Sequence, residues 1–109
     1  MNPNRIRYVD DQNKVTVEDY LKNNRVIFKF VRNKHGQPRG VVLSIGPGKI
    51  GWSKLHWLDA GKWNKHDALT IAVRRAMNPN KLPVDEQFAE ICHEMVERAD
   101  RYYKVKSIT

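Results

Sequence analysis

Residues 25–55 read RVIFKFVRNKHGQPRGVVLSIGPGKIGWSKL, and this stretch decides the fold class. Three runs in it, at 25–32, 41–45 and 49–55, are rich in the β-branched and aromatic residues that favour strands. A polar segment with glycine and proline separates the first run from the second, and a Gly-Pro-Gly turn separates the second from the third. The pattern therefore predicts a three-stranded antiparallel meander.

Helices are predicted before and after this meander in the sequence. Thr16 is a suitable N-cap for a short helix over 16–23, and Asn64 is a suitable N-cap for a longer one that the Asn-Pro-Asn segment at 78–80 ends. A last helix starts near Pro83 and carries a long apolar stripe at three- and four-residue spacing. The expected fold is α+β, a three-stranded antiparallel sheet packed against C-terminal helices in the order αβββαα.

The helical periodicity also predicts which faces meet. On the helix after residue 64, apolar side chains cluster in one arc, and on the first strand a two-residue period places three apolar side chains together. We expect these two sets to share a core, Leu69, Ala72, Val73 and Ala76 against Val26, Phe28 and Phe30. The last helix is expected on the sheet or on the preceding helix.

Length and composition indicate one domain over residues 1–109. A hydrophobic content of 40% is enough for a packed core. No apolar run approaches the roughly 20 residues that span a bilayer, and the polar N-terminus lacks a secretory signal. The single cysteine, Cys92, rules out an intrachain disulfide framework. These features favour the cytoplasm, with no membrane partner.

The net charge of +8 is unevenly distributed. Residues 24–81 hold twelve of the 20 lysines and arginines but only two of the 12 acidic residues, Asp59 and Asp67. Such a basic segment suggests an anionic partner, most commonly nucleic acid. The alternative is a solvated basic face that only keeps the protein in solution.

Three tryptophans lie among the cations of this segment. Large aromatic side chains beside cations can stack bases while the cations hold phosphates, and they also anchor protein interfaces. Trp52, in the middle of a predicted strand, is better explained as a core residue. We expect the strands, their hairpin and the loop before the next helix to present the binding residues, which are Lys29, Arg32, Lys34, Arg39, Lys54, Trp57, Lys62, Trp63, Lys65 and Arg74.

No residue pattern points to catalysis, a metal or a cofactor. The four histidines lack the short ligand spacing of a zinc motif, and Cys92 has no cysteine companion. On an apolar stripe, Cys92 is expected to be a small buried hydrophobe rather than a nucleophile. The expectation is a protein that is not an enzyme.

Arg75 lies at the margin of the apolar arc of its helix, whereas Arg74 is expected to point to solvent. A guanidinium at such a margin either extends outwards or pairs with a carboxylate. Asp59, in the preceding loop, is the more available partner. We therefore expect an Arg75–Asp59 ion pair.

Several short motifs resemble a pattern found in small uncharacterised proteins of bacteriophages. They are Ile50-Gly51-Trp52-Ser53, then Asp59, Trp63-Asn64-Lys65, Ile71-Ala72 and Arg75-Ala76. The resemblance covers about residues 40–77 and departs at Ala68-Leu69, where that pattern has a glycine. It implies a phage or prophage origin and no particular activity.

Two classes of function follow from these observations. The first is a small basic accessory protein that binds DNA or RNA through residues 24–81. The second is a non-enzymatic inhibitor that binds an acidic host protein such as a nuclease, a polymerase or a defence factor. Salt dependence of nucleic-acid binding distinguishes the first, and host-protein capture that survives nuclease treatment distinguishes the second.

Overall fold

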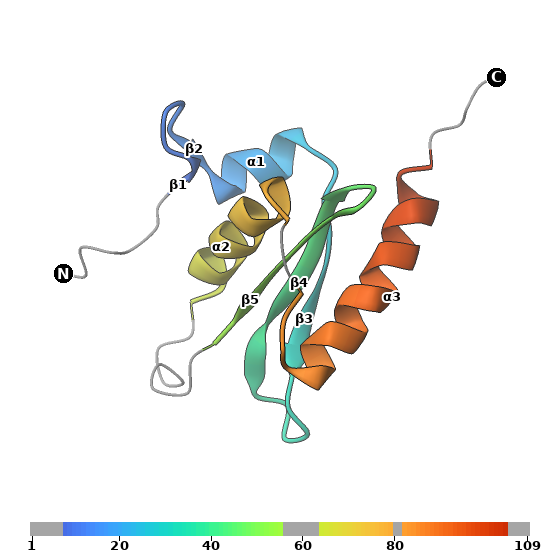
Figure 1. Ribbon diagram of the computed structural model, residues 1–109. Helices are drawn as coiled ribbons and strands as arrows, with labels where there is room; N and C mark the ends of the chain where they lie inside the picture. Colours follow the sequence, from blue (N-terminus) through green and yellow to red (C-terminus); the bar gives the residue numbers. More distant parts are fainter. Residues whose placement is uncertain (1–7, 56–63, 80–81, 105–109) are drawn as a thin grey trace.

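The computed structural model describes residues 8–55, 64–79 and 82–104 (Figure 1). Three strands form the central antiparallel sheet in the order β3-β4-β5. Helices lie before and after it, which confirms the predicted α+β class and the C-terminal position of the long helices. The elements are β1 (Tyr8–Asp10), β2 (Val15–Thr16), α1 (Val17–Asn23), β3 (Ile27–Arg32), β4 (Pro38–Gly46), β5 (Lys49–Lys54), α2 (Lys65–Met77) and α3 (Glu86–Tyr102).

Local capping signals set the helix starts. The Thr16 side chain accepts a hydrogen bond from Asp19 N at 3.2 Å, and the Asn64 side chain accepts one from Asp67 N at 3.0 Å. Each oxygen satisfies a backbone donor that has no partner inside the helix. The last helix begins at Glu86, with Asp85 as its N-cap, rather than at Pro83.

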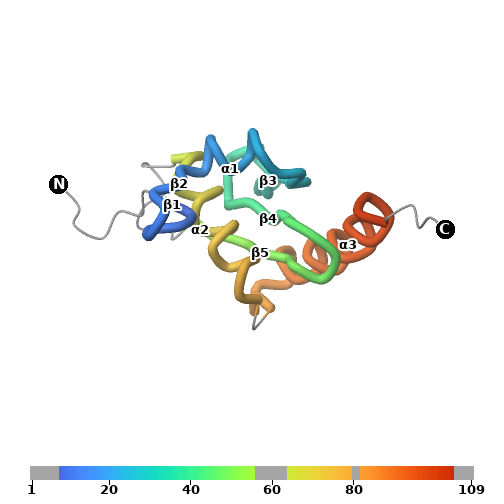
Figure 2. The backbone as a smooth tube through the Cα atoms, turned by 90° about the horizontal axis from the view of Figure 1, so that it is seen from above, coloured from blue at the N-terminus to red at the C-terminus, as the bar shows by residue number. Residues whose placement is uncertain are grey.

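The helices α2 and α3 cover opposite faces of the sheet, as the view from above shows (Figure 2). Strand alternation explains this arrangement, because successive side chains of a strand point to opposite faces. On β4, Val41 and Leu43 belong to the cluster with α2, whereas Val42 belongs to the cluster with α3. The sheet therefore separates two apolar cores.

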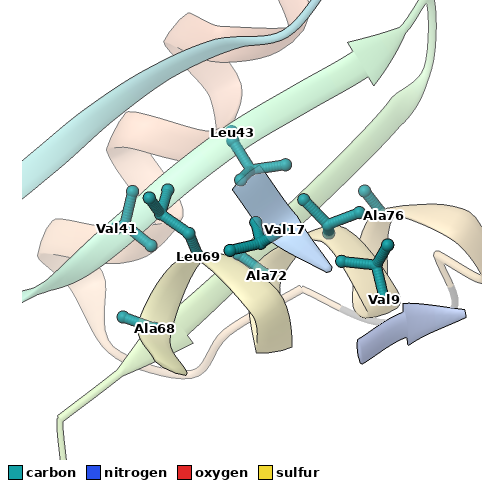
Figure 3. Close-up of a cluster of buried hydrophobic side chains, with 9 residues drawn as sticks. Val9, Val17, Val41, Leu43, Ala68, Leu69, Ala72 and Ala76 are labelled. Carbon is teal, nitrogen blue, oxygen red and sulfur yellow. The ribbon is translucent and has the colours of Figure 1, made fainter. Parts of the chain in front are cut away.

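The contact between α2 and β5 depends on small residues. Gly51 faces α2, and a Cβ at this position would overlap the Ala72 carbonyl oxygen and lie 2.6 Å from Ala76 N. Ala68, Ala72 and Ala76 repeat every four residues along the helix and are buried there, and Figure 3 shows this cluster. The missing side chain at 51 lets the helix backbone lie directly on β5.

This close contact fixes the position of α2 across the sheet. The core that was expected between α2 and the three residues Val26, Phe28 and Phe30 forms only in part. Val26 and Phe30 do pack against the α2 cluster. Phe28 does not belong to the buried core, since 40% of its surface is exposed. Because α2 lies over β5 and β4, it does not cover β3, and the Phe28 side chain on that strand stays partly exposed.

The helix α3 covers the opposite face of the sheet and is hydrogen-bonded to neighbouring backbone near its C-terminus. Phe88, Cys92, Met95 and Ala99 are buried against the sheet. Near the C-terminus of α3, the Tyr103 hydroxyl donates to the Ser44 carbonyl oxygen at 2.9 Å and lies 2.5 Å from that of Arg25.

Two short strands, β1 and β2, were not expected from the sequence. They form an antiparallel hairpin whose Val9 is buried in the α2 cluster. Arg74 of α2 attaches to this hairpin, donating to the Tyr8 carbonyl oxygen at 3.0 Å and to Asp11 at 3.1 Å. The expectation that Arg74 points clear to solvent is therefore wrong. Within the described residues, no helix is long and apolar enough to span a bilayer.

We predict that Gly51→Ala destabilises the protein by about 3 kcal/mol, since the added methyl group strikes helix backbone rather than a flexible side chain. Urea unfolding measures the change as a lower midpoint.

Gly46→Ala is the matched control, because a Cβ there meets nothing closer than 3.8 Å. It should change the free energy of unfolding by no more than about 1 kcal/mol, because alanine is compatible with the backbone there. Equal effects of the two substitutions would contradict the proposed role of the contact at Gly51.

Candidate nucleic-acid interface

Five of the expected binding residues gather at one end of the sheet. In an antiparallel meander, the end of one strand lies beside the start of the next. The hairpin between β3 and β4, the last residues of β5 and the start of α3 accordingly meet at this end (Figure 1). We call this region the hairpin end, and define it by Arg32, Lys34, Arg39, Lys54 and Lys65.

An ion cluster holds the hairpin end to α3. Arg39 Nη2 lies 2.6 Å from an Asp85 carboxylate oxygen, and Lys54 Nζ lies 3.3 Å from the same oxygen. Arg39 also donates to the side chain of Gln87 and lies 5.3 Å from the centre of the Phe88 ring. Arg39 is thus partly buried, with 27% of its side chain exposed, and one carboxylate serves two cations.

The Asp85 carboxylate is stabilised in its charged form. Hydrogen bonds from Arg39, from the Phe88 backbone and from Lys54 outweigh burial and hold its pKa well below the ordinary value of 3.8. The same side chain is the N-cap of α3, accepting from Phe88 N at 3.2 Å. Asp85 therefore links the position of α3 to the arrangement of the cations.

The β3–β4 turn presents Lys34 to solvent on a well-defined frame. The Asn33 side chain accepts hydrogen bonds from His35 N at 2.8 Å and Gln37 N at 2.9 Å. Arg32 Nη1 donates to the Gly36 carbonyl oxygen at 3.0 Å across the same turn. The turn is thus crosslinked by its own side chains, with Lys34 exposed at its tip.

Lys65, the first residue of α2, lies beside an aromatic pair on β3. Its Nζ atom is 5.8 Å from the centre of the Phe30 ring. Phe30 and Phe28 meet edge to face, with ring centres 5.4 Å apart. A cation and two aromatic rings therefore adjoin at the side of the hairpin end.

Two expected binding residues lie elsewhere. Lys29 is on the α3 face of β3, where its Nζ atom is 3.9 Å from Glu94. Arg74 is held by the β1–β2 hairpin, as described above. The basic residues of the strands therefore do not share one uncovered face of the sheet, because each face carries a helix.

Trp57, Lys62 and Trp63 lie outside the described residues, as does Asp59. The Arg75–Asp59 pair therefore stays a prediction. Arg75 does have a different partner, donating to the Trp52 carbonyl oxygen at 3.0 Å with its guanidinium carbon 4.5 Å from the Trp52 ring centre. It reaches around the edge of β5, since Trp52 packs on the α3 side.

Cys92 lies in the core, and His66 lies on the surface of the described structure. Cys92 is fully buried in the α3 core, and burial raises the pKa of its thiol to about 11. Among the described residues, no group of three or more metal-ligating side chains comes together. His66 lies 3.7 Å from Glu18 on the protein surface.

Sequence reasoning missed the contacts that Asp85 and Gln87 make at this end. It favoured Pro83 as the helix start, although an acidic residue before a helix is a common N-cap. It also missed Leu82 and Val84, which are 55% and 99% exposed on either side of the buried Pro83.

Compared with known proteins, the chain matches no family model, no curated protein and no solved structure.

We predict that Asp85→Asn lowers stability by about 1–2 kcal/mol at pH 7, because asparagine keeps the helix cap but loses the charged bonds to Arg39 and Lys54. The folded-state pKa of Asp85 is depressed, so its charge contributes stability above about pH 4 that is lost as the pH falls further. The free energies of unfolding of the two proteins should therefore approach each other as the pH falls from about 4 towards the depressed folded-state pKa of Asp85.

Glu97→Gln is the control, an exposed carboxylate on the same helix. It should leave the free energy of unfolding within about 0.5 kcal/mol of wild type at every pH. A stability difference between wild type and Asp85→Asn that persists undiminished to strong acid would refute the electrostatic account.

Proposed function

We propose that this protein is a small basic accessory protein that binds nucleic acid through the hairpin end. The observation that carries the proposal is the convergence there of cations from four elements, which are separated by up to 33 positions in the chain. Phosphate contacts from lysine and arginine supply the sequence-independent part of nucleic-acid affinity. The phage origin that residues 40–77 imply stays a prediction.

The charge on α3 supports an orientation for this binding. Its exposed surface carries five acidic residues against two arginines. This face repels phosphate, whereas the hairpin end attracts it, so the molecule has a charge asymmetry that favours one approach. Asp85 neutralises only part of the cationic end, because Arg32, Lys34 and Lys65 form no ion pair within the described residues.

A second candidate is an inhibitor that binds an acidic host protein. The exposed Leu82 and Val84 favour it, since apolar side chains held out by a buried proline suit a protein contact. Under this function, Leu82→Ser with Val84→Ser abolishes host-protein capture that survives nuclease treatment. Under the first function, the same double variant binds nucleic acid as wild type does.

We predict that Lys34→Gln with Lys65→Gln weakens binding to DNA or RNA and flattens its salt dependence. Each lost phosphate contact lowers the slope of log affinity against log salt by about 0.7–0.9. Fluorescence anisotropy over a series of salt concentrations measures this slope. Thermal stability should stay nearly unchanged, because both lysines are exposed.

The matched control removes two exposed lysines away from the hairpin end, Lys22→Gln in α1 and Lys49→Gln at the start of β5. This variant has the same net charge as the test variant, so a general charge effect would weaken both equally. The proposal requires a larger loss in the hairpin-end variant. No salt-dependent binding by the wild-type protein would refute it altogether.

A further inference from the structure

The exposed face of β3 beside α2 carries two aromatic rings. Phe28 and Phe30 are two positions apart on the same strand and both point to the α2 side, since their β4 partners Leu43 and Val41 belong to the α2 core. Two strand residues span about 7 Å. Phe28 is 40% exposed because α2 lies on the Gly51 side of the sheet.

Cations lie beside this aromatic pair and beyond it along the strand. Lys65 Nζ lies 5.8 Å from the Phe30 ring centre, and β3 runs from Phe28 directly into Arg32 and the turn that exposes Lys34. A ligand that covers Phe28 and continues along the strand therefore meets positive charge next. This order of an aromatic ring followed by cations is the combination that binds single-stranded nucleic acid.

We propose that Phe28 stacks a base of single-stranded DNA or RNA, whose backbone then follows β3 towards Lys65, Arg32 and Lys34. This inference rests on the proposed function and adds the class of nucleic acid to it. A duplex keeps its bases stacked on one another and offers no free base face, so it gains only the phosphate contacts.

Charge favours this occupant over a second copy of the chain. A copy docked on the same face would bring like charges together, because Arg32 and Lys65 border that face. A single strand brings phosphates to those cations. The face is therefore complementary in charge to nucleic acid and not to itself.

The test compares Phe28→Leu with Phe28→Tyr in the full chain. Leucine keeps an apolar side chain and loses the ring, whereas tyrosine keeps the ring. With a labelled oligo(dT) probe, Phe28→Leu should lose affinity about fivefold to a hundredfold, the range measured for loss of one stacked base. Phe28→Tyr should bind as wild type does, and a duplex of equal length should bind all three proteins alike.

Tyr102→Leu is the matched control, since Tyr102 is an exposed aromatic residue, 46% accessible, at the far end of α3. It should leave oligo(dT) affinity unchanged. As a direct readout, an oligonucleotide that carries 5-iodouracil should crosslink under ultraviolet light to the peptide that contains Phe28. A merely structural role of Phe28 would give no such crosslink.

The outcomes separate the two proposals. If the wild type binds neither probe, the proposed function fails and this inference with it. If both probes bind with steep salt dependence but Phe28→Leu has no effect, the stacking role is wrong and the proposed function stands. If Phe28→Leu instead converts a dimer into a monomer in sedimentation without nucleic acid, the face belongs to a second copy, and the inference is overturned.

Discussion

The close approach of the α2 backbone to Gly51 is the constraint on which the other features depend. Side chains usually fill the space between a helix and the sheet that it covers. In this protein, β5 has no side chain at residue 51, and the facing surface of α2 carries alanine at every fourth position. The helix therefore lies over β5 and the central strand β4 and does not cover β3. This position of α2 leaves Phe28 exposed on β3. At the opposite edge of the sheet, it lets Arg75 reach around β5 and donate a hydrogen bond to the Trp52 carbonyl oxygen.

The antiparallel meander supplies the second constraint, since it returns the chain to the same end of the sheet after every second strand. Basic residues that are far apart in sequence become neighbours there without any long-range motif. Asp85 then ties this end to α3, because one carboxylate caps the helix and accepts from Arg39 and Lys54. Removing its charge therefore acts on helix and cations together. The acidic outer surface of α3 and the basic hairpin end give this small protein two sides of opposite charge.

Features that depend on local signals could be predicted from the sequence. The strands follow from β-branched runs broken by glycine and proline, and the starts of α1 and α2 follow from Thr16 and Asn64. The gathering of Arg32, Arg39 and Lys54 follows from their places at strand ends. The exposure of Phe28 could not be predicted from its strand alone, because it depends on the lateral position of α2, a tertiary property. The pairing of Gly51 with alanines four residues apart was the available signal. The partner of Arg74 depends on the β1–β2 hairpin, whose strands are too short for a clear pattern.

The burial of Cys92 gives the protein a built-in reporter of helix detachment. Its thiol lies midway along α3, between the Asp85 cluster at one end and the Tyr103 hydroxyl at the other. A thiol that is inaccessible and protonated does not react with alkylating reagents. Since this is the chain's single cysteine, the rate of labelling under native conditions reports how often α3 leaves the sheet. That rate distinguishes local opening of one layer from global unfolding, without any engineered probe.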